Sequence, residues 1–185
     1  MSTLTILALG NSLTAGFMVA SRQAYPALLE QKLIAAGYVC RVINAGINGE
    51  TSGGALSRIS RTLTLAPDIV ILETGINDHL MGLDPTLTAK NIRRMVQICR
   101  ENGVTVILAG MRPAPAFGGD EAAFTRLYPT IAEEEAVILI PSFLEGVAGN
   151  SVLTQADGVH PTAAGYKVVA ETVYPYVLEA IEQLL

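Results

Sequence analysis

Short runs of β-branched and other apolar residues alternate along this chain with longer segments whose apolar residues recur at helical spacing. Five such runs are predicted strands, at Leu4–Leu9, Val39–Ile43, Ile69–Glu73, Val104–Ala109 and Val137–Ile140. Strands that alternate with helices form βαβ units, in which the strands are parallel and the helices cover the sheet. The pattern therefore predicts an α/β fold of three layers, with one parallel sheet between two layers of helices.

The segments between the runs predict helices that end at ordinary stop signals, such as Gly37 after the first of them. The predicted helices are Tyr25–Ala36, Ala55–Leu65, Pro85–Glu101, Ala122–Glu135 and Thr162–Leu184. The 185 residues contain no internal repeat, low-complexity tract or linker. A chain of this length buries roughly 70% of its unfolded surface, so we expect residues 1–185 to form a single domain.

Charge and hydropathy exclude several classes of protein. The net charge is −5, whereas a nucleic-acid partner would require a basic face. No apolar run approaches the roughly 20 residues of a membrane span, and no export signal is visible, so we expect no stable membrane insertion. This favours a cytoplasmic protein, or a periplasmic or secreted one if the chain is a processed form. Cys40 and Cys99 are expected to be reduced core residues; a disulfide or a reactive thiol is the alternative.

Polar and glycine-rich segments follow the predicted strands along the chain. They are Gly10–Ser12, Asn44–Thr51, Thr74–His79, Met111–Gly119 and Asp157–His160. In open α/β sheets the ligand crevice lies beyond the carboxyl ends of the strands. We therefore expect these segments to form one composite site.

Ser12 is the candidate nucleophile, on a turn between a strand and a helix. A serine hydroxyl needs an adjacent base to take its proton. The turn would expose the hydroxyl and aim the Ser12 N–H at a developing oxyanion. The alternative is that Ser12 only caps a helix, since serine is common at that position.

His160 is the candidate base, and Asp157 is its expected partner. A carboxylate on Nδ1 fixes the imidazole tautomer that leaves Nε2 facing the serine. The chain has only two histidines, and the competing base is His79, beside Asp78. A metal site made of Asp78, His79, Asp157 and His160 is a further alternative, but its spacing matches no known ligand pattern, so no metal is expected.

Asn77 and Gly49 are candidates for the oxyanion hole. The Asn77 amide can donate to the negatively charged oxygen of a tetrahedral intermediate. Gly49 would add a backbone N–H, because a glycine allows substrate to approach the chain closely. The alternative is that both residues serve only as turn formers.

Four of these segments, in this order, resemble the conserved blocks of the GDSL or SGNH hydrolases. Gly10–Leu13 resembles the first block, Asn44–Thr51 the second, Gly75–Asp78 the third and Asp157–Pro161 the last. The similarity extends from the first predicted strand to the last helix. It is greatest to the compact bacterial branch that contains multifunctional acyl thioesterases, lysophospholipases and arylesterases.

The resemblance implies a flavodoxin-like α/β/α sandwich with the strand order 2-1-3-4-5 and no metal or organic cofactor. It also implies cleavage of small-molecule carboxylic esters or acyl thioesters through an acyl-serine intermediate. Ser12, Asp157 and His160 would form the catalytic triad, and Ser12, Gly49 and Asn77 the oxyanion hole. Two residues depart from the family pattern: Asn11 replaces an aspartate, which removes a charge beside the nucleophile, and Ile76 replaces a glycine.

The loops around the expected site are mostly apolar, which suits a short to medium acyl chain or an aryl group. The residues expected to contact substrate are Ile76, His79, Leu80, Met111, Arg112, Pro113, Phe117 and Val159. Packing of these loops on the sheet is the alternative for each of them.

Two other functions are alternatives to ester hydrolysis. One keeps the triad and removes acetyl groups from carbohydrate, but sugar sites often stack rings and this chain has no Trp. The other is a flavodoxin-like module that binds a phosphate-bearing cofactor without catalysis. The glycine-rich turns lack the residues of a P-loop or a dinucleotide-binding turn, which disfavours this second alternative.

Overall fold

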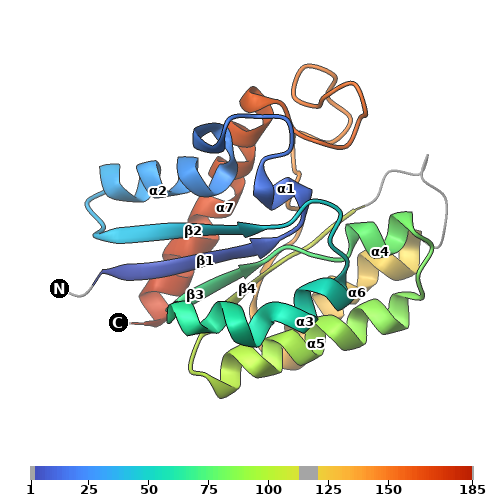
Figure 1. Ribbon diagram of the computed structural model, residues 1–185, viewed down its shortest axis with the longest axis horizontal. Coiled ribbons are helices and arrows are strands. Elements are labelled where there is room, and N and C mark those ends of the chain that lie inside the picture. The colour runs from blue at the N-terminus through green and yellow to red at the C-terminus, as the bar shows by residue number, and fades with distance from the viewer. Residues whose placement is uncertain (1–2, 113–120, 185) are drawn as a thin grey trace.

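The computed structural model describes residues 3–112 and 121–184. Its centre is a parallel sheet of five strands in the order β2-β1-β3-β4-β5 (Figure 1). The strands are β1 (Leu4–Gly10), β2 (Cys40–Gly46), β3 (Ile69–Leu72), β4 (Thr105–Ala109) and β5 (Ile138–Ile140). The predicted α/β class and the strand order 2-1-3-4-5 are both confirmed.

Helices cover both faces of the sheet (Figure 1). Helices α2 and α7 pack against each other on one face, and α3, α5 and α6 pack in sequence on the other. The long helices are α2 (Tyr25–Ala35), α3 (Ser52–Thr62), α5 (Pro85–Glu101), α6 (Glu121–Glu135) and α7 (Ala163–Gln183). The short ones are α1 (Ser12–Ala15), α4 (Ile76–Leu80), η1 (Ser21–Gln23) and η2 (Leu63–Leu65).

The central strands are apolar along their whole length because helices bury both of their faces. All four residues of β3 are buried, as are six of the seven residues of β1. This is the pattern expected of parallel strands inside an α/β sandwich. Strand β2 lies at the edge of the sheet, and its residues are only partly buried.

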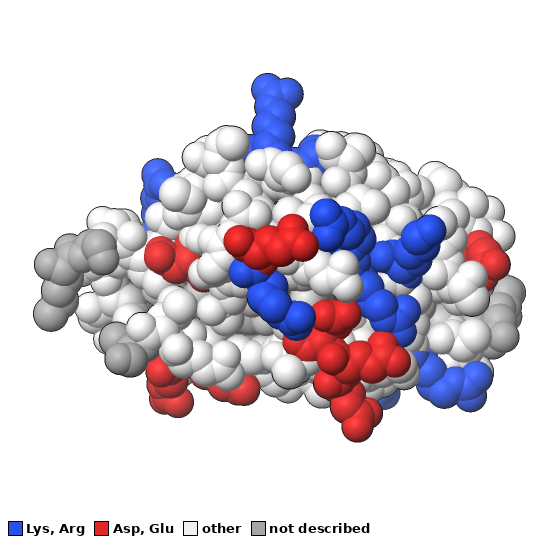
Figure 2. All heavy atoms as spheres, turned by 90° about the horizontal axis from the view of Figure 1, so that it is seen from below, with Lys and Arg blue, Asp and Glu red and all other residues white. Residues whose placement is uncertain are grey.

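The surface over the second helical layer carries charges of both signs. Figure 2 shows basic and acidic side chains lying next to one another on this face. Three ion pairs of α5 and α6 contribute to it: Arg93–Glu134, Arg94–Glu101 and Arg100–Glu135. Exposed pairs of this kind contribute about 0–1 kcal/mol each to stability.

The predicted strands and long helices are confirmed to within three residues at each end. Strand β2 continues through Gly46, beyond the predicted end at Ile43, because its pairing with β1 extends to Gly10 opposite Gly46. The segment around His79, predicted as a loop, is the short helix α4, and the predicted turn at Ser12 continues into the short helix α1. Each is one turn or little more, too short for a hydrophobic period to appear in the sequence.

Among the described residues, no helix has the length and apolar character needed to cross a membrane.

Candidate active site

The segment after β1 places Ser12 at the first position of α1. Asn11 is the N-cap of this helix, and its side-chain Oδ1 accepts a hydrogen bond from the Leu13 N–H at 2.9 Å. Asn11, and not Ser12, therefore caps the helix, so the serine hydroxyl is free for another partner. Gly16 ends the helix in the left-handed conformation after a single turn.

The predicted base lies against this hydroxyl. His160 Nε2 is 2.8 Å from Ser12 Oγ, and His160 Nδ1 is 2.7 Å from Asp157 Oδ2. The structure thus brings residues 148 positions apart into one chain of hydrogen bonds. With Asp157 accepting from Nδ1–H, Nε2 is left to accept the serine proton.

Asp157 is held by its own turn. Its Oδ1 accepts from the N–H groups of Val159 and His160, at 2.9 and 3.0 Å. Partial burial acts to raise the pKa of Asp157, but these two bonds and the bond from the His160 ring outweigh it and leave the pKa below its ordinary value. The carboxylate is therefore charged at neutral pH and can stabilise a protonated imidazole.

Phe17 is a site residue that the sequence analysis did not identify. Its ring lies on the His160 ring, with the centroids 4.5 Å apart and the planes tilted by 38°. The Gln155 side chain joins the two segments, because its Nε2 donates to the carbonyls of Phe17 and Pro161 at 2.9 Å each. The nucleophile segment and the histidine segment are thus bonded to each other. Nothing in the spacing of Phe17 after Gly16 distinguishes it from a core aromatic residue.

The three residues predicted to form the oxyanion hole line one cavity together with His160. A cavity of about 170 Å³ is lined by Ser12, Gly49, Asn77 and His160, among others. Within the described part of the chain, neither the Ser12 N–H nor the Gly49 N–H has an acceptor. Asn77 Nδ2 donates one hydrogen to the Glu50 carbonyl at 2.8 Å, which leaves its second hydrogen available.

Gly49 has a backbone conformation that favours glycine. Its φ is +75°, which an L side chain rarely adopts, whereas a Cβ built there would meet nothing within 4 Å. The positive φ is a reason for glycine at this position that the sequence alone does not reveal.

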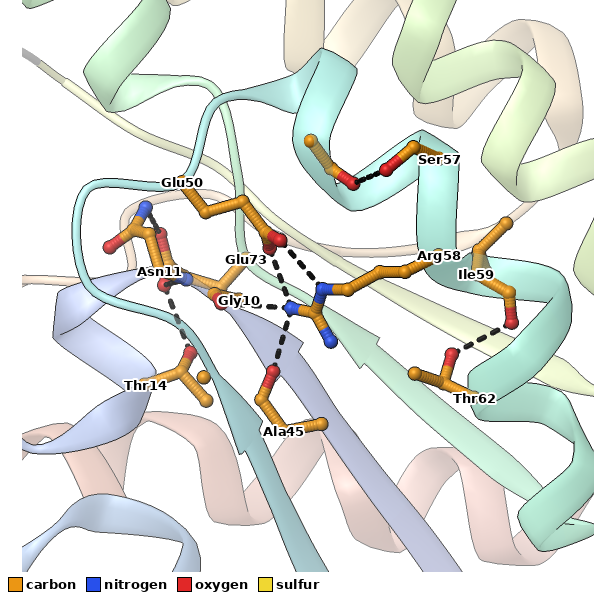
Figure 3. A network of polar contacts seen from close by, with 12 residues as sticks. Gly10, Asn11, Thr14, Ala45, Glu50, Ser57, Arg58, Ile59, Thr62 and Glu73 are labelled. Carbon is orange, nitrogen blue, oxygen red and sulfur yellow. Dashed lines mark hydrogen bonds and ion pairs between the residues drawn. The ribbon is translucent and has the colours of Figure 1, made fainter.

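An ion pair on α3 fixes the segment that carries Gly49 (Figure 3). Arg58 Nε and Nη2 donate to the Glu50 carboxylate at 2.6 and 2.5 Å, and Nη2 also donates to the carbonyls of Ala45 and Gly10 at 2.8 and 3.4 Å. Both side chains are largely buried. Arg58 thereby connects the ends of β1 and β2 to Glu50, whose carbonyl orients Asn77.

Glu73 is a buried acid that is bonded to residues on either side of Ser12 in the sequence. Glu73 directly follows β3 and has 0% of its surface exposed. Burial raises its pKa to about 7, against the lowering effect of hydrogen bonds from Asn11 and Thr14. The sequence analysis included Glu73 only as the end of a strand, although a charged residue closing an apolar run is a recognisable signal of a paired or functional acid.

A larger apolar cavity adjoins the first. Its volume is about 370 Å³ and it shares Leu13, Ile76, Leu80 and Val159 with the cavity at Ser12. Met111 and Arg112 line it as well, and so do residues of the segment 142–149, which the sequence analysis did not include. Of the predicted substrate contacts, Pro113 and Phe117 lie outside the described residues.

The prediction that His79 lies in a loop at the mouth of the site is wrong. His79 is in α4, is 8% exposed and packs on the Phe124 ring at 5.0 Å, and it lines neither cavity. The helix places it toward the core, because Ile76 and Leu80 take the face that lines the cavities. Its neighbour Asp78 is buried and accepts from Ser52 and Thr88. Neither residue lies where a base for Ser12 would be needed.

The described residues also show which side chains could hold a metal ion and in what state the thiols are. In residues 3–112 and 121–184, no group of three or more His, Cys, Asp or Glu side chains is arranged to hold a metal ion. Cys40 and Cys99 are free thiols, and burial raises the pKa of Cys99 to about 12. The thiol of Cys99 therefore stays protonated at neutral pH.

A serine bonded to a histidine that is bonded to an aspartate, at the carboxyl edge of an α/β/α sheet, is the arrangement of a serine hydrolase. Comparison with known proteins identifies the family. Residues 8–168 match the GDSL-like Lipase/Acylhydrolase family, and the chain belongs to it. The resemblance noted from the four blocks is confirmed.

Individual relatives agree with this assignment. The chain is 39% identical to Esterase TesA of Pseudomonas aeruginosa, over 92% of this chain and 86% of that protein. It is 34% identical to Thioesterase 1/protease 1/lysophospholipase L1 of Escherichia coli K12, over 90% of this chain and 80% of that protein. A crystal structure of TesA superposes with a TM-score of 0.92 at 38% identity and covers 95% of this chain and 99% of its own.

Proposed function

We propose that this protein is a carboxylic ester hydrolase that cleaves esters and acyl thioesters through an acyl-serine intermediate on Ser12. The observation that carries the proposal is the hydrogen-bonded chain from Ser12 Oγ through His160 to Asp157, with contacts of 2.8 and 2.7 Å. The family assignment and the relatives named esterase and thioesterase support it.

In the first half of the reaction, Ser12 Oγ attacks the acyl carbonyl carbon while its proton passes to His160 Nε2. The carbonyl oxygen becomes an oxyanion that accepts from the N–H groups of Ser12 and Gly49 and from the free amide hydrogen of Asn77. Each such donor is worth about 2.7–4 kcal/mol of barrier. The C–O or C–S bond then breaks, and His160 returns the proton to the departing alcohol or thiol.

In the second half, water attacks the acyl-serine carbonyl and gives a proton to His160 Nε2. The same three donors hold the second oxyanion. The bond to Ser12 Oγ breaks, Oγ recovers its proton from His160, and the carboxylic acid leaves. Asp157 stays charged throughout and stabilises the imidazolium in both halves.

The acyl group occupies the apolar cavity. Its volume of about 370 Å³ lies at the low end of ligand pockets, which range over about 300–1,000 Å³. Leu13, Ile76, Leu80 and Val159 line both cavities, so an acyl chain bonded to Ser12 has a continuous apolar path. Each methylene buried there adds about 0.8 kcal/mol, or about fourfold in kcat/KM, until the cavity is full. Short to medium acyl chains are therefore the proposed substrates.

Steady-state hydrolysis of p-nitrophenyl esters from acetyl to dodecanoyl tests the proposal, with wild type and Ser12→Ala side by side. The wild type should show a chain-length optimum, and Ser12→Ala should be at least about a thousandfold slower. Equal trace activity in the two proteins would remove Ser12 as the nucleophile. Activity on the acetyl ester alone would favour a deacetylase instead.

A further inference from the structure

The proposed reaction gives no role to the buried acid Glu73, whose side chain bonds only to the segment that carries the nucleophile. Glu73 Oε1 accepts from Asn11 Nδ2 at 2.6 Å. Its Oε2 accepts from the Asn11 N–H at 3.1 Å and from the Thr14 hydroxyl at 2.9 Å. Asn11 and Thr14 both point toward Glu73 (Figure 3), and Ser12 lies between these two donor residues in the sequence.

The contact is tightly packed. A Cβ built on Gly10 would lie 2.6 Å from Glu73 Oε2 and 2.2 Å from Thr14 Oγ1, so this position admits only glycine. With 0% of Glu73 and 1% of Asn11 exposed, water has no access to replace a lost hydrogen bond.

We propose that Glu73 is a positioning residue for Ser12, and that Asn11, where the family pattern has an acid, is the amide matched to its carboxylate. The inference rests on the proposed function, because it concerns the geometry of the nucleophile. Glu73 acts through the turn Asn11–Thr14 and does not touch the reacting atoms.

The hydrogen-bond donors of Asn11 and Thr14 determine which side chains fit at position 73. The Asn11 Oδ1 accepts from the Leu13 N–H, which fixes the orientation of the amide and turns its Nδ2 toward Glu73. Both Glu73 oxygens therefore face donors and both must accept. The ionised carboxylate accepts from all three donors. The protonated acid also fits, because its Oε2–H can donate to the Thr14 hydroxyl while Oε2 still accepts from the Asn11 N–H, whereas an amide NH₂ can accept from neither.

A glutamine at position 73 has one wrong contact in either orientation. If its oxygen faces Asn11 Nδ2, its NH₂ faces the Asn11 N–H. If it is flipped, its NH₂ faces Asn11 Nδ2. In either case two N–H donors face each other in the interior with no acceptor between them. The turn that carries Ser12 must then shift to separate them. Small displacements of a nucleophile cost rate: about 1 Å can cost about 100-fold.

An aspartate at position 11 creates a different defect. Its Oδ1 still accepts from the Leu13 N–H, but its other oxygen faces Glu73 Oε1 across 2.6 Å. Two carboxylates this close must share a proton. The turn is then intact while the proton is bound and disrupted once it is lost, so Asn11→Asp makes the activity fall as the pH rises.

A double variant that exchanges the amide and the carboxylate restores every hydrogen bond. In Asn11→Asp with Glu73→Gln, the aspartate accepts from the glutamine NH₂. The glutamine oxygen then accepts from the backbone N–H of residue 11 and from the Thr14 hydroxyl. The double variant keeps one carboxylate and one amide, with their positions exchanged.

Few other groups titrate beside Glu73. Glu50 acts to raise the Glu73 pKa, and Arg58 pairs with Glu50. Three buried phenols also interact with the carboxylate, and burial raises the pKa of each, so they stay neutral: Tyr25, Tyr128 and Tyr166. A new alkaline limb in Asn11→Asp alone is thus assigned to the pair at positions 11 and 73.

The experiment measures kcat and KM for a p-nitrophenyl ester between about pH 6 and about pH 9, in the wild type, the two single variants and the double variant. We expect Glu73→Gln to lose about 10- to 100-fold in kcat with little change in KM. We expect Asn11→Asp to approach wild type near pH 6 and to lose about tenfold or more near pH 9. The double variant should recover most of the wild-type kcat with a wild-type pH profile.

Circular dichroism at the assay temperature shows which variants are folded, and Glu182→Gln, at an exposed position, is the matched control. Wild-type kcat in folded Glu73→Gln, or a folded double variant with no recovery, overturns the proposal. If Glu73→Gln does not fold, the pH profile of Asn11→Asp decides: a profile that parallels the wild type overturns the proposal. Loss of ester hydrolysis in the wild type itself would instead overturn the proposed function.

Discussion

Two carboxylates bond to the proposed catalytic segments, and their environments are opposite. Asp157 and Glu73 each accept three hydrogen bonds. The Asp157 side chain is 40% exposed and its pKa lies below the ordinary value, whereas Glu73 is fully buried and its pKa is raised to about 7. With equal numbers of donors, burial decides the direction of the shift.

The difference suits the two proposed roles. Asp157 must stay charged whenever His160 is protonated during the reaction. A partly exposed carboxylate that accepts several hydrogen bonds stays charged over a wide pH range. Glu73 holds the turn Asn11–Thr14 from the interior, where loss of a bond cannot be compensated by water. In the proposed mechanism the exposed acid thus serves the chemistry directly, and the buried acid serves the geometry of the nucleophile.

The largest expected effect is at the exposed acid. Asp157→Asn should lower kcat by about 10⁴-fold, because an amide at this position allows His160 the tautomer that presents N–H to Ser12. KM should change little, since Asp157 lines neither cavity. Kinetics with a p-nitrophenyl ester check this, and a loss of less than about tenfold would mean that Asp157 does not orient the base.

The next effect is on stability, at the buried acid. The folded protein holds a proton on Glu73 up to about pH 7, whereas the unfolded chain releases it near pH 4.5. The free energy of unfolding should therefore fall by about 3 kcal/mol as the pH rises through this window. Urea unfolding followed by circular dichroism, at pH values on either side of the window, measures the fall.

The comparison with Glu73→Gln isolates this contribution. The variant should lose most of the pH dependence, since no proton is bound or released at position 73. The exposed variant Glu182→Gln should keep the wild-type dependence. Equal slopes in Glu73→Gln and the wild type would show that Glu73 does not titrate in this range.

A smaller effect is expected at the ion pair between Arg58 and Glu50, beside the proposed oxyanion hole. Arg58→Lys keeps the charge but cannot bond Glu50, Ala45 and Gly10 together, so the Glu50 carbonyl that orients Asn77 should shift. We expect kcat to fall by about 10- to 30-fold with KM nearly unchanged.

Arg93→Lys provides the matched control for this change. Arg93 also donates through Nε and Nη2 to a glutamate, Glu134, but that pair is exposed on α5 and α6. The control should leave kcat within about twofold of wild type, as for other surface pairs. Similar losses in the two variants would indicate a general effect of the substitution.

The smallest effect concerns substrate choice, with both carboxylates untouched. Val159→Phe adds volume to the apolar cavity and should shorten the acyl-chain optimum, at about fourfold in kcat/KM for each methylene excluded. Val152→Phe, at a site 75% exposed, is the control and should leave the optimum unchanged. A chain-length profile of Val159→Phe that matches the wild type would place the acyl chain elsewhere.

Much of this arrangement could be predicted from the sequence. The strand runs are long enough for their apolar pattern to be visible in the sequence. Because parallel strands bring their carboxyl ends to one edge of the sheet, the segments around Ser12, Gly49, Asn77 and His160 could be expected to meet. Short helices such as α4 could not, because one turn carries no period. His79 was misplaced for that reason.

The contacts of Glu73 and Phe17 could not be predicted. Both depend on which side chains face one another across elements that are distant in sequence: Glu73 meets residues 11–14 across neighbouring strands, and Phe17 meets His160 from the other end of the chain. Sequence analysis treated Asn11 as the loss of a charge beside the nucleophile. In the structure a carboxylate is still present there, on Glu73.

The most direct test of the central claim is peptide mapping by mass spectrometry after reaction with a fluorophosphonate, which phosphonylates an activated serine. The account predicts one adduct, on the peptide that contains Ser12, absent in Ser12→Ala and formed far more slowly in His160→Ala. An adduct on another residue would contradict the account. So would a protein that hydrolyses esters but forms no adduct with the fluorophosphonate.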